Sequence, residues 1–281
     1  MSNNFTGIVE KAADSDYSII GFNIFGYEDA IAVVRAAEEI NAPILLMTNK
    51  LAVDHMPVEY WGKLLGSIAE DAKVPVSVHL DHAKEYELAV RAIISGGFSS
   101  VMYDGSKLPL EENIAKTKEI VKLAHSCGVL VEGEIGSVAY SDIDNNVENV
   151  YTDSKEAKLF AEKTGVDWLA VSIGTVHRLQ NQKAVIQYDR LKSIQKEVDI
   201  PLVIHGSSGI KDKDLSKLST MQIGKFNVGT ALRLAFGNEL KNSVNENPEE
   251  FDRLKLFKKP MIKTQEAAKN KMEIVGFNKN N

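Results

Sequence analysis

Residues 75–103 read PVSVHLDHAKEYELAVRAIISGGFSSVMY. A short apolar run at 75–80 precedes a longer segment whose apolar residues recur at helical spacing, and a second short run ends the stretch at 99–103. Short apolar runs of this kind predict buried strands, and a helix between two of them predicts that the strands are parallel. We therefore interpret the stretch as one βαβ unit.

The same alternation recurs along the chain. Strands are predicted at 18–22, 43–47, 75–80, 99–103, 129–132, 168–173, 201–204 and 223–228, with helices at 29–40, 110–126, 154–164 and 188–197 among others. Eight strands that alternate with helices predict an α/β fold, the (β/α)8 TIM barrel. A doubly wound sheet also alternates, but no predicted strand is followed by a glycine-rich dinucleotide fingerprint or a P-loop.

Two segments fall outside this repeat. Residues 136–152, rich in Ser, Asp and Asn, form a long insertion after the fifth predicted strand. Loops of that length in a compact domain are usually functional. Residues 236–281 add C-terminal helices, with a break at Asn247-Pro248, and no low-complexity linker separates them from the barrel. We expect a single barrel domain over residues 1–281.

Composition and charge exclude several classes of protein. The 281 residues are 44% hydrophobic and 26% charged, as in ordinary globular proteins. A formal charge of -6, with basic residues dispersed among acids, provides no basic surface for nucleic acid. A single cysteine, Cys127, excludes an internal disulfide framework. Without a signal-like start or about 20 consecutive apolar residues, the chain is expected to be cytoplasmic and free of a membrane anchor.

Side chains suited to chemistry stand at the predicted C-terminal ends of the strands, where barrel enzymes place their sites. They are Asn23, Thr48, Asn49, Asp81, His82, Glu132, Glu134, His177, His205, Asn227 and Thr230. Three of the six histidines are among them: His82, His177 and His205. Three imidazoles that converge on one rim suit Zn²⁺ and leave a coordination position open. The other three histidines lack this placement, and we interpret them as structural.

Six segments in chain order carry a family resemblance. They are VHLDH at 78–82, SVMYDGS at 100–106, VEGEIG at 131–136, IGTVH at 173–177, IHGSSG at 204–209 and KFNVGT at 225–230. Together they resemble the ordered motifs of the class II fructose-bisphosphate and tagatose-bisphosphate aldolases, and the resemblance covers nearly the whole chain. One such motif is weak evidence, whereas six in this order are specific.

The resemblance implies reversible aldol cleavage of a ketose bisphosphate, of the fructose or tagatose 1,6-bisphosphate type. The products would be dihydroxyacetone phosphate and an aldehyde such as glyceraldehyde 3-phosphate. In this interpretation His82, His177 and His205 hold a catalytic zinc, which acts as a Lewis acid on the ketose carbonyl. Asp81 takes the C4 hydroxyl proton, although a carboxylate in this position could also only orient its neighbouring histidine. The family further implies a sugar-phosphate substrate, a role in carbohydrate metabolism such as glycolysis, and a homodimer or homotetramer.

The resemblance also assigns metal and phosphate contacts. Glu134 and Glu132 match glutamates that relatives use as alternate metal ligands or as partners of the ligands. Small residues and backbone N–H groups suit a phosphate because they allow its oxygens to approach closely, although tight turns alone would also explain the glycines. The implied substrate- and phosphate-binding residues are Asn23, Thr48, Gly206, Ser208, Asn227, Gly229 and Thr230.

Two departures from the family bear on the site. In the loop after strand five, relatives carry Gly-Gly and then a glutamate that exchanges a proton with the dihydroxyacetone phosphate carbon, where this chain has Ala139-Tyr140 and then Asp142. After the second zinc histidine, relatives have a glycine beside the 1-phosphate and a monovalent cation, K⁺ or Na⁺. Arg178 stands there, and it could replace the cation, bind a phosphate or obstruct the site. Arg253 roughly matches an arginine that reaches a neighbouring subunit's substrate phosphate.

Other functions explain fewer of these residues. A Schiff-base aldolase needs a lysine at a strand mouth, and Lys225 precedes the end of its strand. A zinc amidohydrolase places a His-x-His pair after the first strand, where this chain has Asn23 and Phe25. A catalytically altered paralogue that only binds a sugar phosphate stays open because of the altered loop and Arg178. An aldolase for a deoxy or keto-acid phosphate analogue also stays open.

Overall fold

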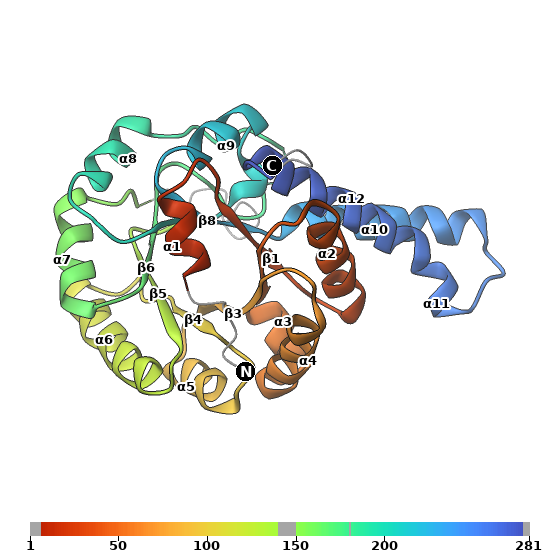
Figure 1. Ribbon diagram of the computed structural model, residues 1–281, viewed down its shortest axis with the longest axis horizontal. Helices are drawn as coiled ribbons and strands as arrows, with labels where there is room; N and C mark the ends of the chain where they lie inside the picture. The colour runs from red at the N-terminus through yellow and green to blue at the C-terminus, as the bar shows by residue number, and fades with distance from the viewer. Residues whose placement is uncertain (1–6, 140–149, 180, 278–281) are drawn as a thin grey trace.

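The strands close into a parallel barrel. The computed structural model describes residues 7–139, 150–179 and 181–277. The barrel runs in chain order from β1 to β8, and β8 pairs back to β1, which confirms the predicted TIM barrel (Figure 1). The strands are β1 (Ile19–Asn23), β2 (Ile44–Thr48), β3 (Val76–Ala83), β4 (Ser100–Tyr103), β5 (Leu130–Ile135), β6 (Trp168–Val171), β7 (Leu202–Ile204) and β8 (Ile223–Val228).

Helices surround the barrel and extend beyond it. They are α1 (Ile8–Ala13), α2 (Tyr27–Ile40), α3 (Lys50–His55), α4 (Val58–Asp71), α5 (Tyr86–Ser95), α6 (Leu110–Ser126), α7 (Ser154–Thr164), α8 (Tyr188–Gln195), the 3₁₀ helix η1 (Ser207–Gly209), α9 (Asp212–Ser219), α10 (Thr230–Glu246), α11 (Arg253–Leu256) and α12 (Lys258–Ile274). The predicted bounds of α7 hold because Asp153 caps its first backbone N–H groups and Gly165, at φ 72°, ends it.

The strands separate two apolar cores. Because successive strand side chains point to opposite faces, Ile20 and Phe22 pack outward against the helices, whereas Ile19 points into the barrel. The inner core also holds Trp168 and is covered by α1. Apolar packing therefore fills the lower part of the barrel, which leaves the C-terminal ends of the strands for polar side chains.

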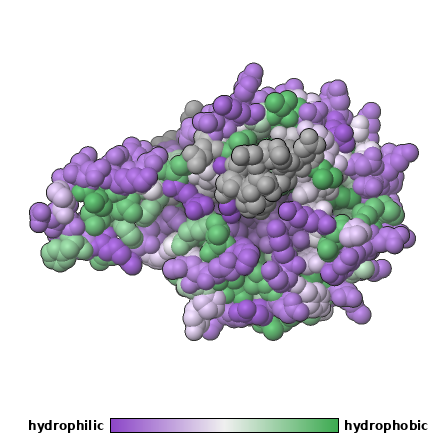
Figure 2. Space-filling view, turned by 180° about the vertical axis from the view of Figure 1, so that it is seen from behind, coloured by the Kyte–Doolittle hydropathy of each residue, from purple (hydrophilic) through white to green (hydrophobic). Residues whose placement is uncertain are grey.

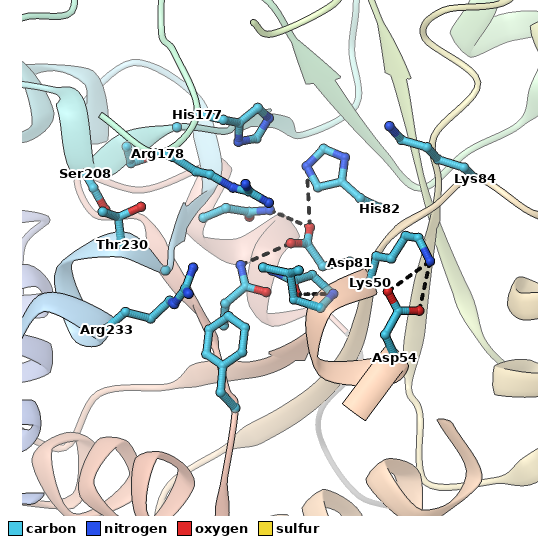
Figure 3. Close-up of a pocket in the computed structure, with 18 of the residues that line it drawn as sticks. Lys50, Asp54, Asp81, His82, Lys84, His177, Arg178, Ser208, Thr230 and Arg233 are labelled. Atoms are coloured by element: carbon cyan, nitrogen blue, oxygen red, sulfur yellow. Dashed lines mark hydrogen bonds and ion pairs between the residues drawn. The ribbon is translucent and has the colours of Figure 1, made fainter. Parts of the chain in front are cut away.

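β3 continues beyond its predicted apolar run, through Asp81 and His82 to Ala83. The pairing of β3 with β4 shifts between Leu80 and Ala83, and His82 has a φ of 54°. A regular pleat would point Asp81 and His82 to opposite faces. The left-handed residue breaks the alternation, and both side chains line the same cavity (Figure 3). Such strained residues persist where the surrounding structure holds them in place, and they cluster at functional sites.

Helices α10, α11 and α12 form an arm that projects away from the barrel (Figure 1). Apolar side chains lie exposed along this arm, among them Val244, Leu254, Ile262 and the 94% exposed Phe251 (Figure 2). Within the described residues, the structure contains no helix with the length and apolar character that crossing a membrane requires.

Candidate active site

A cavity of about 280 Å³ opens at the C-terminal end of the barrel. Its wall is built from the loops that follow the strands, as in other barrels of this type. Most of the predicted site residues line it: Asn23, Asp81, His82, His177, Arg178, Gly206, Ser208, Asn227, Gly229 and Thr230. The rule that barrel enzymes place their sites at the C-terminal ends of the strands, called the strand-end rule below, therefore predicted from the sequence which residues line this cavity.

The three predicted zinc ligands meet beside this cavity. The ring centroid of His82 lies 4.6 Å from that of His205 and 5.0 Å from that of His177. One nitrogen from each ring lies within 4.8 Å of the other two. These nitrogens are close enough to share one metal ion.

Two of the three rings are held by carboxylates. His82 Nδ1 donates to Asp104 Oδ2 at 3.0 Å, and His205 Nε2 donates to Glu132 Oε1 at 2.8 Å. The opposite nitrogens, His82 Nε2 and His205 Nδ1, are buried and have no hydrogen-bond partner among the described residues. Carboxylate–histidine pairs of this kind orient metal ligands, so the donor set fits a metal ion at the shared point.

The surrounding charges favour a cation at this point. Glu134 Oε2 lies 3.7 Å from His82 Nδ1 and 3.5 Å from His205 Nδ1. Burial lowers the pKa of His205, but the nearby carboxylates of Glu132 and Glu134 outweigh burial and raise the pKa to about 10. The same carboxylates that hold a proton on His205 would stabilise a divalent cation, because proton and metal compete for the imidazole.

His177 reaches the site from the loop after β6. Its backbone N–H donates to the carbonyl of Ala139 at 2.8 Å, which ties this loop to the start of the insertion after β5. Burial first, and then the nearby His82 and His205 rings, hold the pKa of His177 well below its usual value. A neutral imidazole is the form that binds a metal.

Arg178 lines the cavity, with its guanidinium directed inward (Figure 3). Its backbone has a φ of 60°, in the left-handed region that favours glycine. A non-glycine residue there costs about 1–2 kcal/mol. The conformation explains why a glycine suits this position, and the inward side chain agrees with the predicted contact to an anionic group.

Asp81 is fixed by two amides. Asn23 Nδ2 donates to one carboxylate oxygen at 3.1 Å, and Asn227 Nδ2 donates to the other at 2.9 Å. Burial raises the pKa of Asp81, but the nearby His82, His205 and Lys225 outweigh it and lower the pKa. Asp81 is therefore an oriented, ionised carboxylate that can accept a proton from a bound hydroxyl.

The far side of the cavity suits an anion. Gly206, at φ 67°, begins η1, and a Cβ there would meet the Val176 carbonyl oxygen at 2.7 Å. Ser208 Oγ accepts from the Ala231 N–H at 3.3 Å, which joins η1 to the first turn of α10. Thr230 and Arg233 of that turn also line the cavity (Figure 3). A helix N-terminus beside hydroxyls and an arginine is suited to a phosphate.

Glu132 and Glu134, both predicted as alternate metal ligands, have different surroundings. Glu134 belongs with His82 and Asp104 to a second group whose donor atoms lie within 4.8 Å of one another. Glu132 belongs to neither ligand group of the described residues. Its Oε1 accepts from His205 Nε2, and its Oε2 is 2.7 Å from Lys225 Nζ.

Two other predicted residues do not line the cavity of their own chain. Thr48 is fully buried at the end of β2, and the next residue, Asn49, lines the wall instead. Arg253 is 71% exposed on the arm, with its Nη2 3.4 Å from Glu28 Oε1. Asp142 lies outside the described residues.

Two residues that the six motifs left without an assigned role could have been found from the sequence. Asp104 follows β4 directly, so the strand-end rule applied to it as well. Lys225 interrupts an apolar strand, and a lysine in such a run is rarely buried without a partner. Of the histidines interpreted as structural, His79 Nδ1 lies 2.8 Å from Ser100 Oγ and His125 Nε2 lies 2.9 Å from Asp167 Oδ2.

The chain is similar to known proteins over nearly its whole length. A family model described as fructose-bisphosphate aldolase class-II matches residues 3–280. A sulfofructosephosphate aldolase of Alkalicoccus urumqiensis is 36% identical over 247 residues, which cover 87% of this chain and 86% of the relative. A fructose-bisphosphate aldolase of Thermus caldophilus is 35% identical, with 96% of each chain covered. The crystal structure of the YdjI aldolase from Escherichia coli K12 superposes with a TM-score of 0.84 at 32% identity, covering 99% of this chain and 98% of that one.

Proposed function

Because the chain belongs to the class II fructose-bisphosphate aldolase family and is an aldolase lyase, we propose that it catalyses zinc-dependent, reversible cleavage of a ketose phosphorylated at C1. The family acts on sugar phosphates and is generally zinc-dependent. The observation that carries the proposal is the convergence of His82, His177 and His205 beside the oriented carboxylate of Asp81. The products are dihydroxyacetone phosphate and an aldehyde.

The protein's own residues bind and orient the substrate and move the proton. A metal held by the three imidazoles supplies a Lewis acid for the ketose carbonyl. Asp81 accepts the C4 hydroxyl proton as the C3–C4 bond breaks and returns it in the synthetic direction. Asn23 and Asn227 keep the Asp81 carboxylate aimed at that hydroxyl. The alternate metal position, if used, involves Glu134 rather than Glu132.

The charges of the cavity support a substrate with anionic groups at both ends. Gly206, Ser208 and Thr230, with Arg178 and Arg233 beside them, would hold the 1-phosphate. Three lysines line the cavity. Lys50 is the first residue of α3, after β2, and pairs with Asp54 at 2.8 Å, whereas Lys84 and Lys107 lie on the loops after β3 and β4. In Figure 3, Lys50 and Lys84 lie across Asp81 and His82 from Ser208 and Thr230. A phosphate or a sulfonate at the distal end of the ketose is compatible with this side.

A substrate panel tests the proposed function. Purified protein is analysed for zinc and then assayed for cleavage of fructose 1,6-bisphosphate, tagatose 1,6-bisphosphate, sulfofructose 1-phosphate and fructose 1-phosphate. We expect cleavage of at least one of the three ketoses that carry an anionic group at both ends, at a higher rate than that of fructose 1-phosphate. Zinc-loaded protein that binds these compounds but cleaves none of them would instead establish the altered paralogue.

Arg178→Gly is expected to raise KM for the preferred ketose about tenfold or more, the scale of one charge-assisted hydrogen bond. If the guanidinium takes the place of a monovalent cation, the variant also acquires a requirement for K⁺ or Na⁺. The fold should not suffer, because glycine accepts the left-handed backbone that Arg178 adopts. Steady-state kinetics with and without K⁺ measure both effects.

Arg91→Ala is the matched control, because Arg91 pairs with Glu59 on the surface and does not line the cavity. Its kinetics should equal those of the parent. An Arg178→Gly variant with parental KM under both salt conditions would remove Arg178 from the binding site.

Asp142→Ala is expected to leave zinc binding intact while slowing the exchange of the dihydroxyacetone phosphate C3 proton with solvent. Asp142 replaces the glutamate to which the family assigns this proton, and a positioned acid–base group contributes roughly 100-fold or more. Deuterium incorporation into dihydroxyacetone phosphate, followed by NMR, measures the exchange. Exchange at the parental rate would assign this proton to another group.

A homo-oligomer, either a dimer or a tetramer, is part of the same proposal. The arm exposes Phe251, Leu254 and Ile262, which a second copy could cover. Arg253 lies on the same arm, is exposed and does not line its own cavity, which is compatible with a residue that serves a neighbouring subunit.

A further inference from the structure

Lys225 is a fully buried lysine inside the barrel. Its Nζ lies 2.7 Å from Glu132 Oε2, 3.8 Å from Met47 Sδ and 5.9 Å from the centre of a Trp168 ring. Charged side chains in such surroundings are costly unless paired. Replacing a buried ion pair with apolar residues is often neutral or stabilising, so stability alone does not account for this pair.

The Lys225–Glu132 ion pair contacts His205, one of the three proposed metal ligands. Lys225 on β8 is in register with Val203 on β7, two residues before His205. Inward side chains two residues apart occupy successive layers of a barrel, so Lys225 lies one layer below His205. Glu132 joins the two layers: its Oε2 faces Lys225, and its Oε1 accepts from His205 Nε2 at 2.8 Å.

We propose that Lys225 is a positioning residue of the metal site, which holds Glu132 in the orientation that directs His205 Nδ1 toward the metal. This inference rests on the proposed zinc site of His82, His177 and His205. Glu132 Oε1 accepts from His205 Nε2, whereas Oε2 faces the Lys225 ammonium at 2.7 Å and His79 Nε2 at 3.7 Å. The carboxylate therefore cannot turn without losing its contact with Lys225 or with His205. His205 Nδ1 is buried, has no hydrogen-bond partner among the described residues and lies 3.5 Å from Glu134 Oε2, and it is the atom that this arrangement leaves for the metal.

The test is a double-mutant cycle read out as zinc affinity. Lys225→Met keeps the length of the side chain and removes its charge, and it is expected to weaken zinc binding about 10–100-fold, the usual effect of losing an outer partner of a metal ligand. If Lys225 acts through Glu132, the same substitution in the E132Q background weakens binding by less than about threefold further. Competition with a fluorescent chelator gives the affinities, and thermal unfolding of the metal-free proteins reports folding separately.

Lys271→Met is the matched control, because Lys271 is also nearly buried in an ion pair, with Asp212 Oδ1 at 2.9 Å, but lies on α12. It should bind zinc like the parent. A folded K225M protein with zinc affinity within about twofold of the parent overturns the proposal, as do additive losses in the cycle. A parent that binds no zinc overturns the proposed function as well, so the two failures are distinguishable.

A measurement on the parent keeps the proposal testable if the variants do not fold. In a crystal structure of the zinc-loaded protein, His205 should bind the metal through Nδ1, with Nε2 on Glu132 and Glu132 on Lys225. Ligation through Nε2, or a Glu132 carboxylate turned away from Lys225, would overturn the role of Lys225.

Discussion

His177→Ala should lose the catalytic zinc and lower aldol cleavage by at least about 1,000-fold, since a metal Lewis acid supplies several kcal/mol of transition-state stabilisation. The variant leaves two imidazoles, His82 and His205, of the three that surround the shared point. The fourth position of such a site belongs to substrate or water, so no protein ligand replaces the missing ring. Metal analysis of the purified variant and a coupled cleavage assay measure both losses.

His125→Ala is the control for this prediction. His125 ends α6, is exposed, and bonds to Asp167 rather than to any residue of the cavity. Zinc content and cleavage should match the parent. Full zinc occupancy in the His177→Ala protein would show that the metal is held elsewhere, for example by His82, Asp104 and Glu134.

Asp81→Ala should keep zinc and lower kcat by roughly 100-fold or more, the usual contribution of a positioned acid–base group. The metal is unaffected because Asp81 belongs to neither ligand group among the described residues. Zinc content and steady-state kinetics in the cleavage direction separate the two effects. Loss of zinc together with activity would mean that Asp81 mainly orients His82.

Asp81→Asn is an informative companion because it preserves size and removes charge. Asn23 and Asn227 each donate to one oxygen of Asp81, and an asparagine offers only one oxygen. One amide donor would then face an NH₂ group, at a cost of about 1–3 kcal/mol for an unsatisfied buried group. We expect kcat to fall as in Asp81→Ala, whereas Asp214→Ala, at a residue bonded to Tyr188 outside the cavity, should keep parental activity.

The fold and most of the cavity wall followed from local sequence features. Strands and helices of a (β/α)8 barrel are consecutive, so apolar runs and helical spacing were enough to predict eight strands and their order. The strand-end rule then placed the side chains of the cavity at one rim, among them His82, His177, Asp81 and the predicted phosphate-binding residues Gly206, Ser208 and Thr230. The bounds of β3 and β5 were underestimated because their polar ends, such as Asp81 and Glu134, look like loop residues.

Contacts between distant strands needed the tertiary structure. Asn23 and Asn227 were predicted to contact substrate, yet they also hold Asp81, which is 58 and 146 residues away along the chain. The sequence analysis treated Glu132 and Glu134 alike, whereas barrel closure places Glu132 between Lys225 of β8 and His205, and Glu134 beside His82 and Asp104.

The sequence by itself determined which residues point to which face, because side-chain direction in a strand alternates with position. Only the tertiary structure decided which inward residues meet, because barrel closure brings together side chains from strands that are far apart in sequence. It also decided the orientation of His82 and Arg178, whose left-handed backbones are uncommon for residues other than glycine and depend on the surrounding structure.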